Sequence, residues 1–215
     1  MEQAPPAKPR IIKYKVFGPK NSGRKSLVFR YSQNAFKNEE APNFNIDFML
    51  RIINKNGKKY QIKIFRPKDD NEMGSKEYLK GIKLAIYIFD VTDPNSIKHF
   101  KDNAEKLFEN ADNNAFKYVF GNKIDLEDKR AIPTEEAKSI CDKYKYCYKE
   151  ISCKSGQNIN EVFDEILENY LKRFPGKKEE PKKVENKIDD ELKDANPFES
   201  SEKVDEIKQQ IKNIK

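Results

Sequence analysis

The sequence predicts an α/β domain with a mostly parallel six-stranded sheet flanked by helices. Two observations predict this fold class. Along residues 11–175 the apolar periodicity switches repeatedly between strand-like and helix-like, as expected when strands and helices alternate around a parallel sheet. Residues 84–89 and 116–120 are mainly apolar, which is typical of central strands buried on both faces. The 215 residues suffice for one such domain and a tail.

The first half of the domain contains three predicted strands and one predicted helix. We expect strands at residues 11–17, 44–53 and 58–65, and a helix at residues 25–31. The second and third strands are joined by Asn54, Lys55, Asn56 and Gly57, and the Asn-Gly pair favours a tight hairpin. Those two strands should therefore be antiparallel.

The second half alternates strands and helices. Residues 84–89, 116–120 and 147–151 are predicted strands. Pro94 opens a predicted helix with Ile97, Phe100 and Phe108 on one face, because proline suits the first helical position. Residues 134–144 form the next predicted helix, and residues 159–170 carry apolar side chains at helical spacing.

The two ends differ in composition from the domain. Residues 1–10 read as a Pro-rich extension, and residues 176–215 carry ten Lys against eleven Asp and Glu, as expected of a charged tail. The tail contains two aliphatic patterns that predict short amphipathic helices: Val184, Ile188 and Leu192, and then Val204, Ile207, Ile211 and Ile214. Either these helices dock on their own domain or fray, or they bind a partner groove or coiled coil.

Composition and charge argue against several classes of protein. The formal net charge is +7, but the lysines are dispersed among acidic residues, so we expect a solvated surface and no nucleic-acid partner. The sequence has no apolar run long enough for a membrane helix and no signal-peptide pattern, which predicts an intracellular, cytoplasmic protein. Glu2 after Met1, and the absence of Cys near Lys215, predict that there is no lipid anchor.

Cysteine and histidine offer no reactive site. Cys141, Cys147 and Cys153 are odd in number and lack metal-ligand spacing, so we expect buried free thiols. His99, the sole histidine, falls on a predicted helix and is expected to face solvent.

The main functional motif follows the apolar run at residues 116–120. Asn122, Lys123 and Asp125 form the pattern N-K-x-D, which reads guanine. A carboxylate such as Asp125 accepts hydrogen bonds from both the ring N–H and the exocyclic amine of guanine, a pair of donors that adenine does not present in that geometry. The motif therefore predicts a guanine site.

Residues 11–174 resemble the Ras superfamily of small GTPases, most closely its Rab branch. The resemblance rests on the motif above and on four further pieces in the correct order: Phe36; residues 45–48; Asp90, Val91, Thr92 and Asp93; and Ser152, Cys153 and Lys154, which are similar to the family's S-A-K. It implies a Ras-like fold and a guanine pocket that includes Lys154.

The resemblance also assigns a role to each residue of the guanine pocket. Asn122 would tie its loop to the phosphate loop, and Lys123 would lie along one face of the base. Phe36 would contact the other side of the ring. The backbone N–H of Cys153 would reach the base oxygen, and Ser152 would orient Asp125. The open alternative is a loop that keeps its inherited shape and binds nothing.

The phosphate loop departs from the family pattern. Gly18 and Gly23 have the spacing G-x-x-x-x-G, but Arg24 then stands where the motif has Lys and Lys25 where it has Ser or Thr. A shift by one residue matches Lys25 and Ser26 but replaces the second glycine by Arg24. We prefer the ungapped alignment because it keeps the following helix in register. The predicted phosphate-binding residues are Gly18, Ser22, Gly23, Arg24, Lys25 and Ser26.

The magnesium and hydrolytic positions also depart from the family. A Ser or Thr hydroxyl normally ligates Mg²⁺ where this chain has Lys25, whose ammonium repels the ion. Arg66 stands for the second-switch carboxylate, Asp69 for its glycine and Asp70 for the water-orienting Gln, while Asn43 falls at the metal-binding Thr of the first switch. We therefore expect no metal site and no catalytic residue.

Two interpretations of Arg24, Lys25 and Arg66 stay open at this point. They are degenerate positions without a ligand, or they supply fixed positive charge in place of Mg²⁺ beside a helix N-terminus that favours phosphate.

The predicted function is a Rab-like pseudo-GTPase that accepts GDP or GTP, hydrolyses it poorly, and acts as an adaptor or structural subunit. Its partners would be proteins that contact the tail and the switch-region surface, in a cytoskeletal or ciliary assembly. The alternative is an active GTP-binding switch in vesicle or ciliary transport with unorthodox catalytic residues.

Overall fold

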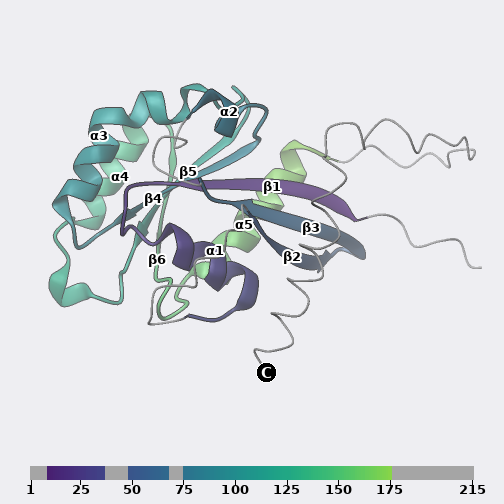
Figure 1. Ribbon diagram of the computed structural model, residues 1–215, viewed down its shortest axis with the longest axis horizontal. Coiled ribbons are helices and arrows are strands. Elements are labelled where there is room, and N and C mark those ends of the chain that lie inside the picture. The colour runs from purple at the N-terminus through teal and green to yellow at the C-terminus, as the bar shows by residue number, and fades with distance from the viewer. Residues whose placement is uncertain (1–8, 37–47, 68–74, 176–215) are drawn as a thin grey trace, which may run out of the picture. The chain divides into compact units, whose positions relative to one another are not determined.

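A six-stranded sheet with the order β2-β3-β1-β4-β5-β6 organises the domain (Figure 1). The computed structural model describes residues 9–36, 48–67 and 75–175. The strands are β1 (Arg10–Phe17), β2 (Phe48–Lys55), β3 (Lys58–Phe65), β4 (Leu84–Asp90), β5 (Phe116–Asn122) and β6 (Cys147–Ile151). The helices are α1 (Arg24–Gln33), α2 (Lys76–Leu79), α3 (Pro94–Glu109), the 3₁₀-helix η1 (Glu127–Lys129), α4 (Thr134–Lys143) and α5 (Ile159–Arg173).

The strand directions confirm the predicted fold class. β1 pairs in parallel with β3 and β4, and β4, β5 and β6 are parallel to one another. Only β2 runs antiparallel to its neighbour β3. The two strands are joined by Asn56 and Gly57, which both have positive φ angles, 53° and 71°, as a two-residue type I′ hairpin requires.

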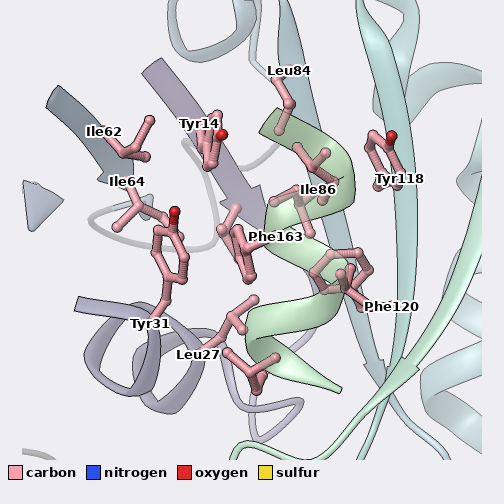
Figure 2. Packing of buried hydrophobic residues seen from close by; sticks show 14 of the residues in the cluster. Tyr14, Leu27, Tyr31, Ile62, Ile64, Leu84, Ile86, Tyr118, Phe120 and Phe163 are labelled. Carbon is pink, nitrogen blue, oxygen red and sulfur yellow. The ribbon is translucent and has the colours of Figure 1, made fainter. Parts of the chain in front are cut away.

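Side chains from the two faces of the sheet form two apolar clusters. On β4, Leu84, Ile86 and Ile88 join the cluster with α1 and α5, while the alternating Ala85, Tyr87 and Phe89 join the cluster with α2, α3 and α4. This alternation explains why β4 is apolar at every position from Leu84 to Phe89. In Figure 2 Phe163 of α5 lies between the sheet and Tyr31 of α1.

Most predicted elements are confirmed within two residues. The start of the second strand, residues 44–47, lies outside the described residues, as do residues 1–8, Asn43, Asp69, Asp70 and the tail helices of residues 176–215. The sequence analysis missed the short α2 and η1, which give too few residues to show a period. No helix in the described part of the chain combines the length and apolar character needed to cross a membrane.

Two predictions about individual side chains were wrong. Cys141 and Cys153 are buried, but Cys147 is exposed, because it begins the edge strand β6. His99 is half-buried and does not simply face solvent, since its Nδ1 lies 2.8 Å from the hydroxyl of Tyr87 and hydrogen-bonds with it. Tyr87 gives the imidazole a buried polar partner that the helix pattern alone does not reveal.

Candidate functional site: a guanine-nucleotide pocket

The predicted site residues gather at the carboxyl edge of the sheet. This is the side at which the parallel strands β1, β3, β4, β5 and β6 all end. The phosphate loop, Arg66 and Ser152 directly follow β1, β3 and β6, while Asp90 and Asn122 are the last residues of β4 and β5. Ligands of open α/β sheets bind beyond the carboxyl ends of the strands, so the topology places these residues where a ligand is expected.

The phosphate loop is a tight turn between β1 and α1. A Cβ on Gly18 would lie 2.0 Å from the carbonyl oxygen of Ile88, so only glycine permits this close passage of the loop past β4. The buried Ser22 donates its hydroxyl to the carbonyl oxygen of Pro19 at 2.8 Å. That bond occupies the Ser22 hydroxyl proton in a contact within the loop.

Asn122 joins the loop after β5 to the phosphate loop. Its Nδ2 donates to the carbonyl oxygen of Ser22 at 2.9 Å, and Asn122 is buried. Gly23 has a φ of 100°, and a Cβ there would lie 2.2 Å from the same Nδ2. The glycine that ends the phosphate loop is therefore needed for the approach of Asn122, and the predicted tie between the two loops is present.

Asp125 and Ser152 are also in contact, as the resemblance implied. The Ser152 hydroxyl donates to Oδ1 of Asp125 at 2.6 Å. Ser152 is fully buried, whereas Asp125 is exposed. The backbone N–H of Ser155 donates to the Ser152 hydroxyl at 3.0 Å and fixes its orientation. An exposed carboxylate held by a buried hydroxyl is arranged to receive the donors of a base.

The ammonium of Lys123 has a partner at the end of the neighbouring strand β4. Its Nζ lies 2.5 Å from Oδ2 of Asp90, the first residue of the D-V-T-D segment. The other oxygen of Asp90 accepts from the backbone N–H of Thr92 at 2.9 Å and from the Thr92 hydroxyl at 2.7 Å. Asp90 thus fixes the ammonium of Lys123, a contact that the sequence analysis did not foresee.

The predicted role of the Cys153 N–H needs a correction. This N–H donates to Oδ1 of Asn122 at 3.0 Å, so it is engaged within the protein and does not point at a base oxygen. Asn122 has both an acceptor and a donor, and the second end of its amide needs a partner when buried. Burial raises the pKa of the Cys153 thiol to about 12, so the thiol stays protonated near neutral pH.

Phe36 and Lys154 both lie next to Arg30 of α1. Phe36 is half-buried, and its ring centroid is 5.9 Å from the guanidinium carbon of Arg30 in α1. Lys154 is exposed. Arg30 also hydrogen-bonds to the carbonyl oxygens of Cys153 and Lys154. The sequence analysis missed Arg30, although a single arginine within the apolar run at residues 27–31 was a usable signal.

The positively charged residues begin α1 and follow β3. Arg24 is half-buried at the first position of α1, Lys25 is exposed, and Ser26 is half-buried. Arg66 is half-buried directly after β3, at the same edge of the sheet as the phosphate loop. Asn43, Asp69 and Asp70, for which the resemblance implied lost switch functions, lie outside the described residues.

The segment after the second switch is anchored to the sheet. Tyr78 of α2 is buried, and its hydroxyl donates to the carbonyl oxygens of Val16 at 3.0 Å and Phe65 at 3.2 Å. These carbonyls belong to the ends of β1 and β3, so α2 is fixed at the edge that carries the site.

Comparison with known proteins agrees with this geometry. A sequence model of the Ras family matches residues 13–172, which is most of the chain. The chain belongs to the Ras family. Within this family it is similar to Rab proteins.

Three relatives illustrate the similarity. Ras-related protein RAB1BV from Beta vulgaris is 29% identical over 179 residues, 80% of this chain and 83% of its own. Ras-related protein RABE1e from Arabidopsis thaliana is 28% identical over 76% of this chain and 77% of its own. Ras-related protein Rab-13 from Canis lupus familiaris is 25% identical over 78% of this chain and 84% of its own.

A guanine nucleotide fits the residues present, and a lysine occupies the position of one of the family's Mg²⁺ ligands. The Ser152–Asp125 pair and the loop tied by Asn122 suit a base, and the N-terminus of α1 suits a phosphate. At the position of the family's hydroxyl ligand, Lys25 offers only an ammonium, which has no lone pair for a cation.

Proposed function

We propose that this protein is a Rab-like pseudo-GTPase. It binds GDP or GTP through its base pocket without Mg²⁺, does not hydrolyse GTP at a useful rate, and acts as an adaptor or structural subunit in the cytoplasm. The observation that carries the proposal is the coexistence of two contacts expected of a guanine site, Asn122 bonded to Ser22 and Ser152 bonded to Asp125, with a lysine at the family's metal-ligand position.

Electrostatics favours metal-free binding. A diphosphate carries negative charge that Mg²⁺ normally neutralises, and Arg24, Lys25 and Arg66 all lie at the edge where the phosphates would bind. Fixed cations and the N-terminus of α1 supply the same sign of charge. Hydrolysis needs more than neutral charge, since the attacking water must be oriented and the transferring group stabilised.

Replacing Lys25 by Ser tests whether fixed cations take the place of Mg²⁺. For the wild-type protein, we expect the rate of single-turnover GTP hydrolysis in Mg²⁺ to equal the rate of GTP hydrolysis without protein. In Lys25→Ser a hydroxyl replaces the ammonium, so Mg²⁺ should raise GDP affinity about tenfold, equal to about 1.4 kcal/mol, while wild-type affinity should not depend on Mg²⁺.

Lys58→Ser is the matched control, because Lys58 is exposed beside the hairpin and loses the same charge. Its affinity for GDP should not respond to Mg²⁺. Magnesium-dependent hydrolysis by the wild-type protein would instead favour an active GTP-binding switch.

An exposed apolar strand supports the adaptor role. Phe48, Leu50 and Ile52 of β2 are 36%, 38% and 57% exposed and lie on the face opposite Met49 and Ile53, which pack on the core. β2 is an edge strand of the sheet. Large apolar side chains in a row on an edge strand favour protein contacts. The adaptor would act in a cytoskeletal or ciliary assembly through this surface and the tail.

Charged substitutions on β2 should abolish that contact. The double variant Leu50→Lys with Ile52→Lys should lose proteins recovered with the wild type, yet keep its unfolding free energy within about 0.5 kcal/mol, as exposed substitutions usually do. The control Glu135→Gln with Glu161→Gln makes the same charge change at exposed helix positions. The amounts of partner protein that co-purify with each variant are then compared. If the β2 variant recovers as much as the wild type, β2 is not the contact surface. If deletion of residues 177–215 leaves recovery unchanged, the tail is not a contact surface.

A further inference from the structure

Arg30 connects α1 to the loop after β6. It lies in the last turn of α1, half-buried. Its Nε donates to the carbonyl oxygen of Cys153 at 2.8 Å, and its Nη2 donates to the carbonyl oxygen of Lys154. One planar guanidinium therefore holds two successive peptide carbonyls of the guanine loop.

The same guanidinium also lies near Phe36. Its carbon lies 5.9 Å from the centroid of the Phe36 ring, at the outer limit of a cation–π contact. Gly156, with a φ of 87°, lies beside it, since a Cβ there would be 3.7 Å from Nη1. Arg30 thus contacts three residues of the predicted guanine site, Phe36, Cys153 and Lys154.

These contacts extend a chain of hydrogen bonds from the phosphate loop to Arg30. Ser22 of the phosphate loop is bonded to Asn122, Asn122 to Cys153, and Cys153 to Arg30. Arg30 belongs to the helix that begins directly after the phosphate loop. The loop after β6 is consequently held at both backbone polar groups of Cys153: the N–H donates to Asn122, and the carbonyl oxygen accepts from Arg30.

We propose that Arg30 is a positioning residue that holds the loop of residues 152–157 closed around the guanine base. This inference rests on the proposed nucleotide binding. By fixing the peptide carbonyls of Cys153 and Lys154, Arg30 sets the orientation of the loop that carries Ser152, and Ser152 orients Asp125. Lysine cannot replace it fully, because an ammonium lacks the planar fork that spans two carbonyls.

Two measurements on the full chain test this role. The first is the release rate of bound fluorescent GDP after addition of excess unlabelled GDP. We expect Arg30→Gln to release GDP about tenfold faster than the wild type, and Arg30→Lys to fall between them. The second is amide hydrogen exchange without nucleotide. The N–H groups of Cys153 and Gly156, bonded to Asn122 and to the Ser152 carbonyl, should lose protection in Arg30→Gln.

Arg51→Gln is the matched control. Arg51 also bonds to α1, at the carbonyl oxygen of Tyr31, but its other partner is Asn160 in α5 and not the guanine loop. Its substitution should leave both readouts at the wild-type level.

The outcomes separate this inference from the proposed function. A wild-type protein that retains no GDP defeats the proposed function, while loss of Cys153 and Gly156 protection in Arg30→Gln still supports the loop-holding role. Unchanged protection in Arg30→Gln overturns the inference, and so does an equal loss in Arg51→Gln, which would indicate general loosening of the domain.

Discussion

Replacing Asp125 by Asn is expected to weaken GDP binding by roughly 100-fold or more. The carboxylate would accept two hydrogen bonds from guanine, each worth about 1.5 kcal/mol or more for a charged acceptor. The amide of Asn presents a donor toward the donors of the base, so at least one bond is lost and an unpaired group remains. Ser152 would still bond to the Asn oxygen, which leaves the loop in place.

Titration with GDP and with xanthosine diphosphate measures this effect. Xanthine has an oxygen where guanine has its exocyclic amine, so Asp125→Asn should gain affinity for xanthosine diphosphate while losing GDP. A matched control is Asp128→Asn, an exposed carboxylate in η1. Equal GDP affinity of wild type and Asp125→Asn would show that Asp125 does not read the base.

Replacing Phe163 by Ala is expected to cost about 3–5 kcal/mol of unfolding free energy, the usual range for a buried Phe. The Phe163 ring is 1% exposed, and its centroid lies 3.9 Å from that of Tyr31 and 5.9 Å from those of Tyr14 and Phe120 (Figure 2). The substitution removes ring contacts to both α1 and the sheet and leaves a cavity between them.

Urea unfolding monitored by circular dichroism measures the loss of unfolding free energy. Phe163→Leu, which keeps most of the apolar volume, serves as the control and should cost less. A cost below about 1 kcal/mol for the alanine variant would mean that the surrounding residues close the cavity. Phe163 would then contribute less to the stability of this cluster than its burial indicates.

Much of the fold could be predicted because local patterns and the tertiary fold agree. The hairpin followed from Asn56 and Gly57, whose positive φ angles suit few other residue pairs. β4 followed from its unbroken apolar run, which two separate clusters now explain. The start of α3 at Pro94 also agreed, with the Asp93 side chain accepting from the N–H of Asn95 at 2.9 Å.

The errors arose where side chains choose among partners that are distant in sequence. The family resemblance put Asn122 and Cys153 in one predicted guanine site, but it did not show that the N–H of Cys153 donates to Asn122. The contact of Lys123 with Asp90 joins the ends of neighbouring strands. Cys147 was expected to be buried, but its exposure follows from the position of β6 at the edge of the sheet. Such contacts depend on tertiary position rather than on local periodicity.

The charges near the phosphate loop form the most unusual part of the site. In the family pattern a small hydroxyl residue follows the loop, whereas this chain has Arg24 and Lys25 at the start of α1. Positive charges at a helix N-terminus interact unfavourably with the helix dipole. A bound diphosphate would offset this interaction, which would give nucleotide binding a stabilising role on the folded protein.

The most direct test of the account is the retention of guanine nucleotide in the absence of divalent metal. The purified full-length protein is loaded with GDP, passed through a desalting column in EDTA, denatured, and its nucleotide is quantified by chromatography. We predict that GDP remains bound in EDTA at the same stoichiometry as in Mg²⁺ and raises the melting temperature equally in both. Loss of GDP in EDTA, with retention restored by Mg²⁺, would contradict the metal-free site that the account assigns to Arg24, Lys25 and Asp125.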